Sequence, residues 1–132
     1  GETMVNFTRK PRYGYEDLLE IIRLLRSPEG CPWDKVQTHA SIRRGLLEEA
    51  YEAAEAIDLD DAGLLQEELG DVLFAAVKVG RFAGIDPEEA VAGTCEKFIR
   101  RFRAVEDGAR QQGRTLEDMS LEEMTRLWNR AK

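Results

Sequence analysis

The sequence predicts an all-α fold, a bundle of about five helices centred on a helical hairpin. Apolar residues recur at helical spacing in several segments of the 132-residue chain, and capping residues precede several of those segments. No segment shows the alternation of apolar and polar residues that is typical of strands. The composition, 42% hydrophobic and 34% charged with 4 prolines, is that of a folded domain.

The first helix is predicted over residues 15–26, where one face carries the apolar residues Leu18, Ile21, Ile22 and Leu25. Two prolines and a glycine in the stretch SPEGCPWD, residues 27–34, then predict a structured loop. Trp33 in this loop is interpreted as packing within it, with stacking on a base or sugar as the alternative. We expect residues 1–14 to form an N-terminal extension, with residues 1–3 added ahead of a native start at Met4. Residues 15–132 are predicted to fold as one domain.

The second and third helices, predicted at about 41–57 and 62–82, form the central hairpin. The short acidic link between them offers Asp60 and Asp61 as caps of the third helix. The third helix is apolar around most of its circumference, which places it at the centre of the fold. Because the other helices supply too little apolar cover for this hairpin, we expect a homodimer.

The fourth helix is predicted to begin after Asp86, with Glu89 completing a capping box, and to extend to about Gly108 or somewhat beyond. Its expected core stripe is Phe98, Phe102 and Val105. Ser120 and Glu123 have capping-box spacing and open a short terminal helix.

Charge and cysteine content exclude several classes of function. The net charge is −7, from 26 acidic and 19 basic residues, which argues against nucleic acid or a membrane surface as the main partner. The cysteines, Cys31 and Cys95, are interpreted as reduced thiols. No signal peptide or bilayer-spanning apolar run is present, so we expect a cytoplasmic protein. An anionic substrate would need a metal or clustered bases.

Two pairs of acidic residues at i, i+3 spacing stand out on the hairpin. At about 100° of rotation per residue, Glu49 falls inside the apolar arc of its helix and Glu52 at the edge of that arc. Glu68 and Asp71 are arranged in the same way on the third helix. In an antiparallel hairpin, residues at one height have numbers with a constant sum, and Glu52 with Glu68 gives the same sum as Glu49 with Asp71. The four carboxylates are therefore predicted to converge.

Converging carboxylates in a partly buried space either acquire raised pKa values or bind a cation. Oxygen ligands without nearby His or Cys select a hard ion, so the sequence predicts Mg²⁺, with Mn²⁺ as a substitute. A di-iron site needs Glu-x-x-His on two helices, which the single histidine, His39, excludes. In the competing interpretation the acids form a solvated edge balanced by nearby cations, namely Lys78, Arg43 and Arg44. Glu55 and Glu67 are interpreted as solvated side chains.

The segment KFIRRFR supplies the bases that a metal-bound phosphate would need. Lys97 and Arg101 lie at i, i+4 and can address one ligand, although a basic solvated face would look the same. Glu48 points to a different arc from the predicted ligands and is a candidate to polarise water. Trp128 is either a core aromatic or a platform for a base or sugar.

Several segments resemble the MazG nucleoside triphosphate pyrophosphohydrolases, namely CPWDKVQTHASI, LLEEAYEAAEAI, EELGDVLF, KFIRRFRAVE and LEEMTRLWNRAK. The resemblance covers nearly all of residues 15–132. It implies a dimeric all-α protein that cleaves nucleoside triphosphates between the α- and β-phosphates with Mg²⁺. Longer members carry two tandem domains and this chain has one. Its RRFRAVE is typical of the second domain, and CPWD of the front of the first.

The resemblance also implies residue roles. The EExxE motif implies Glu49 and Glu52 as metal ligands with Glu48 beside the nucleotide, and ExxD implies Glu68 and Asp71 as the remaining ligands. The KFxRR pattern implies Lys97 and Arg101 near the phosphates. The terminal tryptophan implies Trp128 near the nucleotide, with Lys132 as a further contact.

The predicted function is therefore Mg²⁺-dependent hydrolysis of nucleoside triphosphates to monophosphate and pyrophosphate, with removal of unwanted nucleotides as its role. Two alternatives stay open. One is a related all-α pyrophosphatase that acts on dUTP or phosphoribosyl-ATP. The other is a non-enzymatic helical interaction module.

Overall fold

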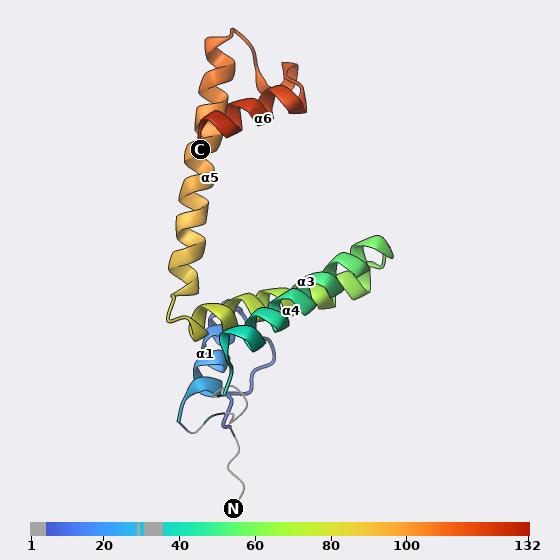
Figure 1. Ribbon diagram of the computed structural model, residues 1–132, viewed down its shortest axis with the longest axis vertical. Helices are drawn as coiled ribbons and strands as arrows, with labels where there is room; N and C mark the ends of the chain where they lie inside the picture. The colour runs from blue at the N-terminus through green and yellow to red at the C-terminus, as the bar shows by residue number, and fades with distance from the viewer. Residues whose placement is uncertain (1–4, 29, 31–35) are drawn as a thin grey trace, which may run out of the picture. The chain divides into compact units, whose positions relative to one another are not determined.

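The computed structural model describes residues 5–28, 30 and 36–132, and these residues form helices and no strands (Figure 1). The helices are α1 (Tyr15–Arg26), α3 (His39–Asp58), α4 (Ala62–Phe82), α5 (Pro87–Gln111), the short 3₁₀ helix η1 (Leu116–Asp118) and α6 (Leu121–Arg130). The predicted all-α class is confirmed. The expectations for residues 1–3, Cys31 and Trp33 lie outside the described residues.

Capping chemistry explains most of the helix boundaries. The α4 helix begins where Asp61 accepts a hydrogen bond from the Leu64 amide at 3.0 Å. The α6 helix opens with the predicted capping box of Ser120 and Glu123. The α3 helix starts two residues earlier than predicted. Thr38 is its N-cap, and Ser41, expected to be the first residue, instead completes the capping box from the third helical position.

The chain forms two compact units, Gly1–Pro87 and Glu88–Lys132. In the N-terminal unit α3 and α4 lie side by side as an antiparallel hairpin, and α1 packs against α4 (Figure 1). The turn of the hairpin contains Asp60 in the left-handed region, with φ of 53°. The single domain expected over residues 15–132 stays a prediction.

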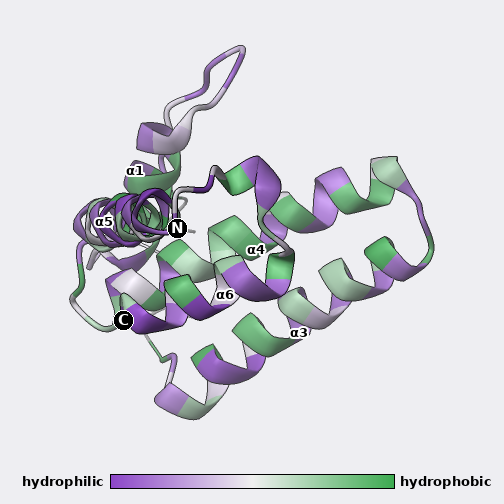
Figure 2. Ribbon diagram, turned by 90° about the horizontal axis from the view of Figure 1, so that it is seen from above, coloured by the Kyte–Doolittle hydropathy of each residue, from purple (hydrophilic) through white to green (hydrophobic). Residues whose placement is uncertain are grey.

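The predicted central helix is contacted on two sides but is not enclosed by the described residues. Among the described residues of this unit, the buried apolar side chains are Ile22, Ala53, Ala56 and Val77. Leu69 and Leu73 on α4 remain 49% and 63% exposed. Figure 2 shows apolar and polar residues interspersed along α3 and α4. The expected homodimer stays a prediction.

The C-terminal unit has its own core where α6 and η1 meet the C-terminal half of α5. Its buried residues are Val105, Ala109, Met119 and Leu127. The prediction of a core stripe on α5 is right for Val105 and wrong for Phe98 and Phe102, which are 54% and 41% exposed. The reason is that the buried cluster of this unit begins at Val105. The Phe98 and Phe102 rings stack on each other outside it, with centroids 5.9 Å apart, and the Phe98 ring also contacts the Trp128 ring.

No helix among the described residues combines the length and the apolar character needed to cross a bilayer.

Candidate metal centre

Four carboxylates from the two arms of the hairpin converge at one place. Glu49 and Glu52 come from α3, and Glu68 and Asp71 come from α4. One carboxylate oxygen of each lies within 4.8 Å of those of the other three. This is the convergence that the spacing along the two helices predicts.

The sequence around the cluster explains why the helices approach so closely there. Ala53 and Ala56, on the face of α3 that carries Glu49, are small and only 7% and 0% exposed, so this part of α3 packs closely. Glu49 and Glu68 are half-buried, whereas Glu52 and Asp71 are exposed. The helical rotation predicted this difference within each pair.

Burial and repulsion between the acids both raise the pKa values of the half-buried glutamates, Glu49 and Glu68. Burial is the main cause that raises the pKa of Glu49, followed by the charges of Glu52 and Asp71. Burial also raises the pKa of Glu68, followed by a hydrogen bond and the charge of Glu52. The Oε2 atoms of Glu49 and Glu68 are buried and have no hydrogen-bond partner among the described residues. Buried acceptor oxygens without donors, in an oxygen-only set, fit a hard divalent cation.

A groove of about 370 Å³ opens from the acidic cluster along α3 and α4. Its apolar lining residues are Ile42, Gly45, Leu46, Phe74 and Ala75. Its polar lining residues, besides Glu49 and Asp71 of the cluster, are Gln37, Ser41, Arg44, Glu48 and Lys78. A Cβ added at Gly45 would meet no atom within 4 Å, so the groove is open there. The volume falls in the range of small-molecule sites.

Glu48 lies beside the cluster without belonging to it. Its side chain is exposed and lines the groove, whereas the neighbouring Glu49 belongs to the cluster. The structure thus separates Glu48 from the four converging acids, as the helical rotation predicts. Its catalytic role stays a prediction.

The other candidates lie in the C-terminal unit. The guanidinium of Arg101 lies over the Trp128 ring, 5.4 Å from its centroid, and the Phe98 ring is also 5.4 Å from that ring. Arg101 is half-buried, and its Nε has no hydrogen-bond partner among the described residues. Trp128 packs against the buried cluster of the unit, which agrees with its interpretation as a core aromatic. Lys97 and Lys132 are exposed. Substrate contacts for these residues stay predictions.

Sequence reasoning missed the groove, although a signal was present. Phe74, Ala75 and Lys78 follow Asp71 at i+3, i+4 and i+7, which places them on the same face of α4. Lys78 and Arg44 were expected only as counter-ions of a solvated acidic edge. Continuing the helical faces beyond the acids would have identified the lining residues.

Comparisons with known proteins agree with this architecture. Residues 37–105 match the MazG nucleotide pyrophosphohydrolase domain. The chain is 47% identical over 91 residues to the nucleoside triphosphate pyrophosphohydrolase/pyrophosphatase MazG of Thermotoga maritima, covering 66% of this chain and 36% of that protein. It is 36% identical over 124 residues to the nucleoside triphosphate pyrophosphohydrolase of Mycolicibacterium smegmatis, covering 89% of this chain and 36% of that protein.

A crystal structure of a mazG-related protein from Thermotoga maritima has a TM-score of 0.63 and 34% identity to this chain. That match covers 88% of this chain and 96% of the other. By contrast, the chain spans between 17% and 36% of the length of the first curated relatives, which include the Escherichia coli nucleoside triphosphate pyrophosphohydrolase.

Proposed function

Because the chain belongs to the MazG nucleotide pyrophosphohydrolase family, we propose that it hydrolyses nucleoside triphosphates to a monophosphate and pyrophosphate. The observation that carries the proposal is the cluster of four carboxylates within 4.8 Å, with two buried oxygens left without donors. Glu49, Glu52, Glu68 and Asp71 would hold Mg²⁺, or Mn²⁺ in its place. When bound, the ion would neutralise charge on the phosphate oxygens.

We propose that a side chain beside the cluster activates the attacking water. Glu48 lines the groove next to Glu49 and remains exposed, so in this proposal its carboxylate accepts the proton of the attacking water. The water oxygen bonds to the α-phosphorus, and the bond from that phosphorus to the bridging oxygen of the β-phosphate breaks. The released products are nucleoside monophosphate and pyrophosphate.

Three further roles rest on the family resemblance. Lys97 and Arg101 donate hydrogen bonds to the phosphates, and Trp128 contacts the nucleoside. The contact between the Arg101 guanidinium and the Trp128 ring supports the role of Arg101, because it keeps the guanidinium in a fixed place. We further propose that the chain acts as a cytoplasmic homodimer that removes unwanted or non-canonical nucleotides.

The test is pyrophosphate release from a panel of ribo- and deoxyribonucleoside triphosphates, with dUTP and phosphoribosyl-ATP included, measured with Mg²⁺ and with chelator. We expect turnover that requires the metal and yields monophosphate plus pyrophosphate. Products of nucleoside diphosphate and phosphate would contradict the assigned bond. Turnover that survives chelation would contradict the metal site, and an absence of turnover on every substrate would favour the interaction module.

A further inference from the structure

The groove places one half-buried cation beyond the acidic cluster. Lys78 lies on the same face of α4 as Asp71, about two turns or roughly 10 Å further along the helix axis. Arg44, which also lines the groove, is exposed, whereas Lys78 is half-buried. Of the two basic residues that line the groove within the described part of the chain, Lys78 is therefore the more buried.

The two ends of the groove suit different parts of a nucleotide. The acidic end suits phosphates accompanied by a divalent cation. The apolar surface beyond it includes the ring of Phe74 together with Ile42 and Ala75, and such a surface suits a flat nucleobase. With the phosphates at the acidic end, a base would lie along this surface beside Lys78.

The ammonium group of lysine has a one-sided hydrogen-bonding capacity. It offers three donors and no acceptor. Hypoxanthine, guanine and uracil present an oxo acceptor at the edge where adenine and cytosine present an amino donor. An amino group placed opposite a half-buried ammonium would leave two donors facing each other, at a cost in free energy.

We propose that Lys78 is a specificity-determining residue that selects nucleotides whose base carries an oxo group at this edge. The inference rests on the proposed function for the placement of the phosphates. It concerns the choice of base, which neither the acidic cluster nor Lys97 and Arg101 would explain.

The test uses two substrate pairs that differ mainly at this edge, ITP against ATP and UTP against CTP. We expect the wild-type chain to prefer ITP and UTP in kcat/KM by about tenfold, the effect of one charge-assisted hydrogen bond. Lys78→Met should bring both ratios close to one, and Lys78→Arg should preserve them because it keeps the donors. Arg44→Met serves as the matched cation control and should leave both ratios unchanged.

Binding of IMP and AMP with Mg²⁺, measured by calorimetry, makes the same comparison without turnover. A wild-type preference for IMP that Lys78→Met abolishes supports the inference even where hydrolysis fails, so the two proposals can be told apart. An equal loss for all substrates in Lys78→Met would place the ammonium on the phosphates and overturn the inference. Equal use of both members of each pair by the wild type would overturn it as well.

Discussion

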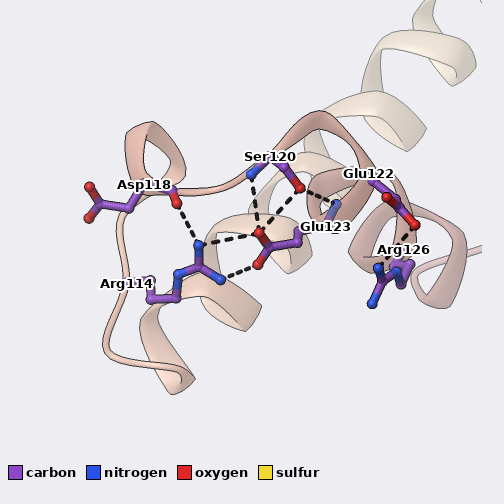
Figure 3. Close-up of polar contacts among 6 residues, drawn as sticks. All are labelled: Arg114, Asp118, Ser120, Glu122, Glu123 and Arg126. Atoms are coloured by element: carbon purple, nitrogen blue, oxygen red, sulfur yellow. Dashed lines mark hydrogen bonds and ion pairs between the residues drawn. The ribbon is translucent and has the colours of Figure 1, made fainter.

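Glutamates of the two units have opposite electrostatic surroundings. In the C-terminal unit, Glu123 receives hydrogen bonds from Arg114, which also donates to the carbonyl oxygen of Asp118, and from Ser120 (Figure 3). The Arg114 guanidinium and the Ser120 amide hold the pKa of Glu123 below its usual value. In the hairpin, burial and neighbouring acids raise the pKa values of Glu49 and Glu68.

The two clusters differ in the source of the positive charge that balances their carboxylates. The Arg114 and Glu123 cluster contains both signs of charge within the chain, and it holds the loop before α6 in place. The acidic cluster contains one sign only, so its stability depends on protonation or on a cation from solution. We therefore expect changes at the first cluster to affect stability and changes at the second to affect activity.

The largest expected effect is on turnover. Glu49→Gln and Glu68→Gln should each lower kcat by about 100-fold or more, since each removes a charged ligand of the proposed ion. Glu55→Gln on α3 and Glu67→Gln on α4 are matched controls, because both side chains are exposed and lie outside the cluster. Pyrophosphate release measures the effect. Equal loss in the controls, or full activity in both cluster variants, would contradict the proposed site.

The next effect is the stabilisation by metal alone. Mg²⁺ at 100 times its dissociation constant should stabilise the wild-type chain by about 2.7 kcal/mol, because it binds the folded state. Glu68→Gln should lose most of this gain, and Arg114→Met should keep it despite a lower starting stability. Thermal unfolding with and without Mg²⁺ measures both. Loss of the Mg²⁺ response in Arg114→Met, with the response kept in Glu68→Gln, would contradict the assignment of the metal to the acidic cluster.

A smaller effect has opposite signs in the two clusters. Without metal at neutral pH, Glu68→Gln should raise the midpoint of thermal unfolding, since it removes a carboxylate that burial and neighbouring charges disfavour. Glu123→Gln should lower the midpoint, since it weakens the bonds to Arg114. Both substitutions keep the shape of the side chain. Midpoints that moved in the same direction would show that the clusters do not differ as described.

The smallest effect is on the pH dependence of stability. The folded-state pKa of Glu68 is raised, so the wild-type chain without metal should lose stability as pH rises from the usual value of 4.5 through the folded pKa. The folded-state pKa of Glu123 is lowered, so its contribution is present above 4.5 and lost as pH falls through the folded pKa.

Unfolding midpoints recorded from pH 3 to 8 test both signs. The difference between wild type and Glu68→Gln should appear only on the neutral side of that range. The difference between wild type and Glu123→Gln should disappear on the acid side. A difference for Glu68→Gln that was largest at the lowest pH would refute the assigned direction.

The hairpin and its acids could be predicted because they depend on local rules. Periodicity and capping placed α1 and α4 at the observed residues, and the antiparallel register aligned Glu49 with Asp71 and Glu52 with Glu68. Thr38 was missed as the cap of α3 because the helix was predicted to begin at about residue 41, whereas Ser41 is the third residue of the observed helix.

What could not be predicted depends on neighbours that periodicity does not specify. The pattern shows which face of α5 is apolar, but it does not show that Phe98 and Phe102 lie outside the buried cluster of their unit. The groove was missed for a similar reason. An empty volume is decided by the side chains around it, including the missing side chain at Gly45.

The turn that contains Asp60 has a consequence for how this site can vary in evolution. A substitution changes one ligand, but a residue inserted so that it extends α3 or α4 at the turn changes which residues face each other along the hairpin. One added helical residue rotates the side chains beyond it by about 100° and shifts them by about 1.5 Å along the axis. The two acidic pairs would then no longer face each other, so the site depends on the length of the helices as well as on its glutamates and aspartate.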